Sequence, residues 1–98
     1  MEFNKKTIWK LQKEKLAEYL IEREGSTKES LERDYNAYQE MLFKKIEQKP
    51  ETFIEVYEFP TVKCCCYFAV CFLLDGFEVS WHQIDKNDWY RMIVSWGK

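Results

Sequence analysis

The chain has 98 residues, of which 46% are hydrophobic, 17% aromatic and 33% charged, and its formal net charge is −2. This composition excludes an intrinsically disordered chain, and the length allows one domain over residues 1–98. Residues 1–50 hold eleven basic and ten acidic side chains, and residues 51–98 hold four basic and seven acidic ones. Neither half concentrates one sign of charge, so nucleic-acid binding driven by phosphate neutralisation is not expected.

The longest apolar run, residues 64–74, has eleven residues. A membrane-spanning helix needs about 20 residues, so no membrane segment is expected. The N-terminus is charged and lacks the apolar segment of a secretory signal. We therefore expect an intracellular, cytoplasmic protein.

Two amphipathic helices are predicted in the first half of the chain, over residues 5–24 and 27–48. The connection between them is about two residues long, which makes them antiparallel neighbours. Their buried stripes are expected at Ile8, Trp9, Leu16, Tyr19 and Leu20 in the first helix and at Leu31, Tyr35, Tyr38, Leu42 and Ile46 in the second.

The ends of both helices carry local signals. Asn4 is a suitable N-cap for the first helix, and Gly25 can adopt the left-handed conformation that ends it. Ser26 and Glu29 have the spacing of a capping box for the second helix. Pro50 disfavours helical conformation at the residue before it and stops that helix.

Four antiparallel strands are predicted in the second half, over residues 53–59, 62–74, 77–84 and 89–96. Asp75-Gly76 lies between two apolar runs and favours a hairpin, because both central residues of a type I′ turn need positive φ. The strands then follow one another across the sheet in chain order. The predicted fold class is α+β, with an N-terminal antiparallel helical hairpin packed on one face of a C-terminal four-stranded antiparallel meander, in two layers.

Two turns set the register of this meander. A turn at Asp75-Gly76 and a polar connection at residues 85–88 each place apolar side chains on the same buried face. The expected apolar pairs are Leu74 with Phe77, Phe72 with Val79, Val70 with Trp81, Trp81 with Met92, Val79 with Val94 and Phe77 with Trp96. The first strand is expected to pair with residues 62–74, with Glu58 opposite Lys63 and Glu55 on the otherwise apolar side.

The opposite face of the predicted sheet is mixed, whereas a solvated antiparallel face alternates to polar residues. Tyrosine, tryptophan and arginine are enriched at interface hot spots. This face is either covered by another part of the chain or buried against a second copy or a partner protein. The candidate interaction residues are Tyr67, Cys71, Leu73, Ser80, His82, Ile84, Trp89, Arg91 and Ile93.

Four cysteines, at positions 64, 65, 66 and 71, are candidates for chemistry. In an extended strand Cys64 and Cys66 lie about 6.6 Å apart on one face, which suits neither a shared zinc ion nor a disulfide. We expect free thiols packed as small apolar side chains. The alternatives are a disulfide elsewhere in the fold, through Cys65 or Cys71, or a metal site.

His82 is the only histidine, and the predicted register places it beside Arg91 and diagonal to Cys71. A cysteine and a histidine can act as nucleophile and base, but diagonal neighbours lie about 7 to 8 Å apart and a flat sheet offers no oxyanion hole. The alternatives are an ordinary polar row or recognition of an anion by Arg91 and His82. A small-ligand or thiol-based catalytic site, with Ser80 and Glu78 nearby, is the second functional hypothesis.

The first helix is locally basic around Trp9. Its lysines are Lys5, Lys6, Lys10, Lys13 and Lys15, and glutamates at positions 14, 18, 22 and 24 follow at once. Mixed lysine and glutamate are typical of a solvated helix face. Weak nucleic-acid binding by this helix is the third hypothesis.

The favoured prediction is a small non-enzymatic interaction module. It would bind itself as a homodimer, or bind a host or partner protein, through the back of its sheet, and no catalytic residue, cofactor or metal is assigned to it. In general character a compact chain rich in lysine, glutamate, aromatics and unpaired cysteine resembles the small orphan proteins of phages and archaeal viruses. That resemblance rests on composition and on no motif.

Overall fold

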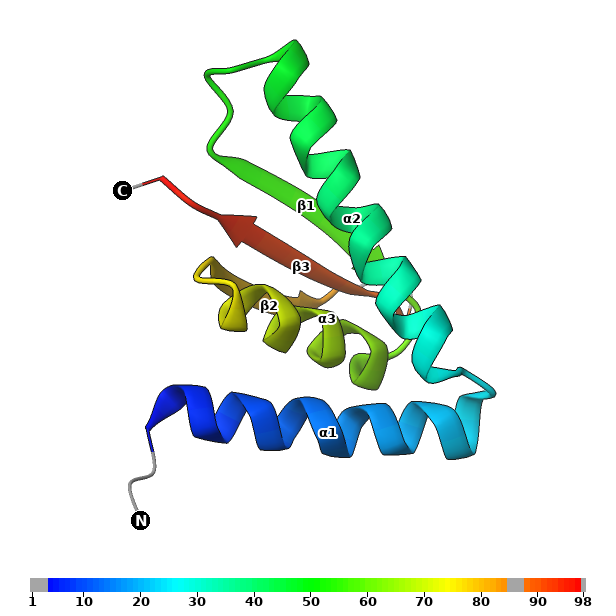
Figure 1. The fold of residues 1–98 in the computed structure, drawn as a ribbon. Helices are drawn as coiled ribbons and strands as arrows, with labels where there is room; N and C mark the ends of the chain where they lie inside the picture. Colours follow the sequence, from blue (N-terminus) through cyan, green and yellow to red (C-terminus); the bar gives the residue numbers. More distant parts are fainter. Residues whose placement is uncertain (1–3, 85–87, 98) are drawn as a thin grey trace.

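Three helices lie on one side of a three-stranded antiparallel sheet in the described part of the chain (Figure 1). The structure is a computed structural model and describes residues 4–84 and 88–97. Its elements are α1 (Lys5–Glu24), α2 (Lys28–Gln48), β1 (Ile54–Phe59), α3 (Val62–Leu74), β2 (Glu78–Gln83) and β3 (Tyr90–Ser95). The predicted α+β composition with an antiparallel sheet is confirmed, and the predicted four-stranded meander is wrong.

Residues 62–74, predicted as a strand, form helix α3. Thr61 caps this helix, because its Oγ1 accepts a hydrogen bond from the Cys64 backbone N–H (3.2 Å). Seven of the thirteen side chains of α3 are buried, since α1 packs on one side of the helix and the sheet packs on the other. Such a helix is apolar around its whole circumference, and its sequence has no period that distinguishes it from a buried strand.

The Asp75-Gly76 pair ends α3 and does not form the predicted hairpin turn. Gly76 has a φ of +95°, its N–H donates to the Leu73 carbonyl (3.0 Å), and the Phe77 N–H donates to the Phe72 carbonyl (3.1 Å). These two bonds define a Schellman cap, which needs the same positive φ at glycine as the predicted turn. The strand pairs predicted across Asp75-Gly76 therefore do not form.

The sheet has the strand order β1-β3-β2, so β3 is the central strand. The register predicted between the last two strands is confirmed, because Trp81 is opposite Met92 and Val79 is opposite Val94. Of the connection predicted at residues 85–88, residues 85–87 lie outside the described part of the chain.

Strand β1 pairs with β3 and not, as predicted, with residues 62–74. Glu58 is consequently opposite Arg91 instead of Lys63. Glu55 does fall on the apolar side, as predicted, and its carboxylate accepts a hydrogen bond from Lys45 Nζ on α2 (2.8 Å). That ion pair explains how a carboxylate is tolerated at the margin of the core.

Helices α1 and α2 diverge from their short connection and do not form a closely packed hairpin (Figure 1). α1 packs mainly along α3, so α3 separates it from the strands. α2 packs on β1 and α3, where the Tyr38 ring makes edge contacts with Tyr57 (5.1 Å) and Phe59 (5.5 Å) of β1 and with Phe68 (5.0 Å) of α3. The prediction that both helices cover the sheet is wrong, because α2 contacts β1 at the edge of the sheet and α1 packs on α3.

The N-cap and C-cap predicted for α1 are both present. The Thr7 N–H donates to Asn4 Oδ1 (3.0 Å), and Gly25 has a φ of +72°. The capping box of α2 lies one residue later than predicted, because Thr27 and Ser30 exchange the two reciprocal hydrogen bonds (2.9 and 3.0 Å).

The predicted stripe of α2 is confirmed and that of α1 is only partly correct. Leu31 and Leu42 are buried, with Tyr35, Tyr38 and Ile46 packed against them in the core. In α1, Leu20 is buried, but Ile8 and Tyr19 are exposed. The buried side of α1 therefore differs from the predicted one. The reason is that α1 packs on α3, which was predicted as a strand of the sheet.

Replacing Thr61 with alanine tests the cap of α3. We expect the free energy of unfolding to fall by about 1 kcal/mol, because the first-turn N–H loses its acceptor. Thr61→Ser keeps the hydroxyl and is expected to retain most of that stability. Urea unfolding followed by circular dichroism measures all three proteins, and equal midpoints for the two variants would contradict the cap.

Candidate functional site

The side of the sheet that faces away from the helices carries nine side chains, which we call the open face. Side chains alternate along a strand, and Tyr57, Phe59, Met92 and Val94 are buried on the helix side. The open face therefore consists of Ile54, Val56 and Glu58 of β1, Arg91, Ile93 and Ser95 of β3, and Glu78, Ser80 and His82 of β2. No helix or strand of residues 4–84 and 88–97 covers it.

Strand register arranges the open face in three rows that cross the strands. The middle row is Val56-Ile93-Ser80, one flanking row is Glu58-Arg91-His82, and the other is Ile54-Ser95-Glu78. Apolar side chains thus occupy two of the three middle positions. Charged side chains lie toward both ends.

Two large aliphatic side chains of this face are well exposed. Ile54 is 50% exposed and Val56 is 45% exposed, and the half-buried Ile93 lies directly across from Val56. Single exposed apolar residues are ordinary, but neighbours in register on a bare sheet form a continuous patch. Burying such a patch against another surface lowers the free energy, because apolar area is removed from water.

The charged row carries an ion pair within the chain. Arg91 donates to Glu58 Oε2 from Nη2 (3.0 Å) and from Nε (3.3 Å). Both side chains are more than one-third exposed, so solvent screening limits the contribution of the pair to less than about 1 kcal/mol. His82 is opposite Arg91 on the other side and is exposed.

Four of the nine predicted interaction residues lie on the open face, namely Ser80, His82, Arg91 and Ile93. Ile84 and Trp89 continue the same alternation at its end, where the Ile84 N–H donates to the Trp89 carbonyl (2.9 Å). The remaining three, Tyr67, Cys71 and Leu73, belong to α3 on the helix side of the sheet, because their segment is a helix and not a strand.

The predicted neighbourhood of Cys71 and His82 is wrong. Cys71 is buried in α3, above the face that carries Met92 and Val94, whereas His82 and Arg91 lie on the opposite face. The sheet separates the thiol from the imidazole. The arrangement required for a cysteine nucleophile with His82 as its base is not formed.

All four thiols are free, and burial makes them poor nucleophiles. Burial raises the pKa of Cys65 to about 12 and the pKa of Cys64 to about 11. It also raises the pKa of Cys71 to about 11, although the Lys13 ammonium acts in the opposite direction. The pKa of Cys66 is likewise raised by burial. Packed, protonated thiols fit the expectation of small apolar side chains.

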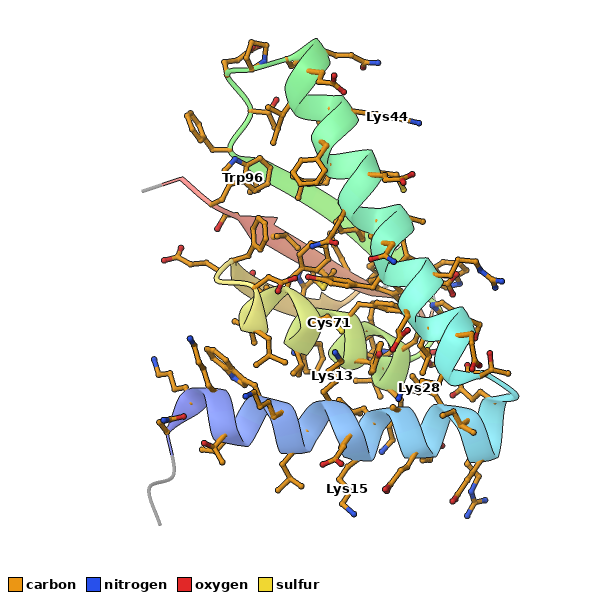
Figure 2. All side chains as sticks on the ribbon, in the orientation of Figure 1. Lys13, Lys15, Lys28, Lys44, Cys71 and Trp96 are labelled. Carbon is orange, nitrogen blue, oxygen red and sulfur yellow. The ribbon has the colours of Figure 1, made fainter. Side chains whose placement is uncertain are left out.

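A second concave region lies between α1, the start of α2 and α3. It is a pocket of about 490 Å³ whose apolar lining includes Ala17, Leu31 and Leu74. Figure 2 shows Lys13 pointing from α1 toward α3, where Cys71 lies, while Lys15 points away. The pocket lining holds three lysines (Lys10, Lys13, Lys28) and three glutamates (Glu14, Glu18, Glu32). This balance selects neither an anion nor a cation.

Sequence reasoning missed the β1 side of the open face. Ile54 and Val56 alternate with Tyr57 and Phe59, and this alternation was a local signal for two different faces. The sequence did not reveal that β1 pairs with β3. Assigning residues 62–74 to a strand had provided β1 with another neighbour.

Comparison with protein-family models, with curated proteins and with solved structures finds no match for the chain. Among the helices of the described residues, none has both the length and the apolar character needed to cross a membrane. The same residues contain no group of three or more histidine, cysteine, aspartate or glutamate side chains that could hold a metal ion.

Thiol reactivity tests the packing of the cysteines. In a Cys66→Ser variant at pH 8, the three remaining thiols should each react with a disulfide reagent at least about a hundredfold more slowly than in urea, because pKa values of about 11 for Cys64 and Cys71 and about 12 for Cys65, against an ordinary 9.0, deplete the thiolate by that factor or more. The reaction should accelerate as the pH rises toward 11. A native rate equal to the rate in urea would contradict the packing.

The same pKa shifts link stability to pH. Unfolded thiols ionise near their ordinary pKa of 9.0, whereas the folded thiols stay protonated to higher pH. Raised folded pKa values stabilise the fold below pH 9, and this contribution is lost as the pH rises toward 12. Urea midpoints of the wild type should therefore fall more steeply over this range than those of a Cys64→Ala, Cys71→Ala double variant.

Proposed function

We propose that this protein is a small non-enzymatic interaction module that binds another protein surface through the open face of its sheet. One observation carries the proposal: Ile54, Val56 and Ile93 form an apolar patch on a sheet face that the described residues leave bare. Arg91 and His82 border this patch and can fix the orientation of a partner by hydrogen bonds.

The shape of the site also supports a macromolecular partner. The open face is the surface of a sheet, and small-molecule sites are generally concave. The pocket described above lies on the helix side and shares no residue with the open face. A protein surface is the partner that an extended sheet face fits best.

A charge placed in the centre of the patch tests the proposal. Val56→Lys is expected to weaken association at least about tenfold, because it removes an apolar contact and buries an ammonium group. Sedimentation velocity and light scattering over micromolar to millimolar concentrations provide the measurement. The thermal unfolding midpoint should change little, since Val56 is about half exposed on an edge strand.

Met41→Lys is the matched control, because Met41 is 52% exposed and lies on α2, away from the open face. It should leave association unchanged. A wild-type monomer at every concentration would restrict the module to a different protein as partner. Equal association of the wild type and Val56→Lys would contradict the use of this face.

A further inference from the structure

One two-fold axis brings the mostly apolar middle row of the open face onto itself and brings His82 opposite Glu78. We infer that the occupant of this face is a second copy of the chain, packed face to face about a two-fold axis that runs along the Val56-Ile93-Ser80 row. This inference rests on the proposed function and specifies its partner. It follows from which side chains the axis places opposite one another.

Rotation about this axis sets β1, β3 and β2 over the same strands of the second copy, with their directions reversed. The middle row then meets itself, so Val56 lies over Val56 and Ile93 over Ile93 of the second copy. The flanking rows exchange places, so Arg91 lies over Ser95 and Glu58 over Ile54 of the second copy. His82 lies over Glu78 of the second copy, and its imidazole N–H can donate to that carboxylate. Symmetry repeats this contact, so one interface contains it twice.

The other aligned arrangement is a two-fold axis parallel to the strands, and it is less favourable. It sets β1 over β2 and β3 over itself, which brings Arg91 directly over Arg91 of the second copy. It lays Glu78 over Ile54 and Glu58 over His82, which match the Glu58-Ile54 and Glu78-His82 contacts of the first axis, so these contacts do not separate the two arrangements. It also lays the apolar Val56 over Ser80 instead of over Val56 of the second copy. The opposed Arg91 side chains and the loss of the Val56-Val56 contact disfavour this pairing, so these two differences favour the axis that crosses the strands.

The face is small. Three strands of six residues, at a spacing of about 4.8 Å and a rise of about 3.4 Å, present roughly 14 by 20 Å. Stable interfaces bury about 800 Å² per partner, so we expect a weak, reversible dimer. Packed sheets twist by about 30° relative to each other, which leaves the central contact at Ile93 in place.

Substitutions that reverse the roles of Glu78 and His82 test the orientation of the two copies. The two residues are four apart on β2, roughly 13 Å, so they do not pair within one copy. Glu78→Lys opposes a lysine to His82, and His82→Glu opposes two carboxylates. Each variant alone should dimerise several-fold more weakly than the wild type.

Combining the changes should restore the dimer. The double variant E78K, H82E and an equimolar mixture of the two single variants should both associate within about threefold of the wild type, since each rebuilds a lysine-glutamate pair between copies. Sedimentation equilibrium measures the double variant, and native mass spectrometry resolves the mixed dimer by mass.

A mixture of Glu58→Lys with His82→Glu is the matched control, because only the axis parallel to the strands brings these two residues together. Restoration by this mixture instead, or by neither, would overturn the proposed orientation. If Val56→Lys still abolished association, the open face would remain the binding surface. A monomeric wild type at every concentration would overturn the second copy as its occupant.

Discussion

The burial of α3 between α1 and the sheet is the constraint on which the rest of the structure depends. Phe68 stacks on Phe59 of β1 (5.5 Å between ring centroids), and Phe72 contacts the rings of Tyr35 and Tyr57 (5.0 and 5.9 Å). Removing one such buried ring typically costs 3–5 kcal/mol, a large fraction of the stability of a small domain. α1 packs mainly against α3, so its position also depends on this helix.

Polar contacts attach α2 to the same helix. The Tyr35 hydroxyl donates to the Asp75 carboxylate just after α3, and Gln39 Nε2 donates to it as well (3.2 Å). Burial, and then this hydrogen bond, raise the pKa of Tyr35 well above its ordinary value, so the phenol stays a donor across the physiological range. α3 therefore organises both other helices on one side of the sheet. None of these three helices lies on the opposite side of the sheet (Figure 1).

Sequence predicted the parts of the fold that short-range signals determine. Asn4 and Gly25 delimit α1 through contacts within one turn, and the Trp81-Met92 register follows from alternation in two adjacent strands. α3 was misassigned because an all-apolar run has no period and because Asp-Gly serves both a hairpin and a Schellman cap. Its thirteen residues are long for a strand, and Thr61 before it was an unused capping signal.

The candidate site was likewise predicted correctly only where short-range signals determine it. Ser80, His82, Arg91 and Ile93 were placed correctly, since the β2-β3 register is local. Part of the apolar character predicted for that face came from Tyr67, Cys71 and Leu73 of α3, which lie on the helix side of the sheet. Two of the three apolar residues of the patch, Ile54 and Val56, belong to β1, which pairs with β3 because residues 62–74 form a helix and not a strand between them. The helix that completes the core thereby also determines which strand supplies the exposed patch, so the chemistry of the open face depends on contacts made on the other side of the sheet.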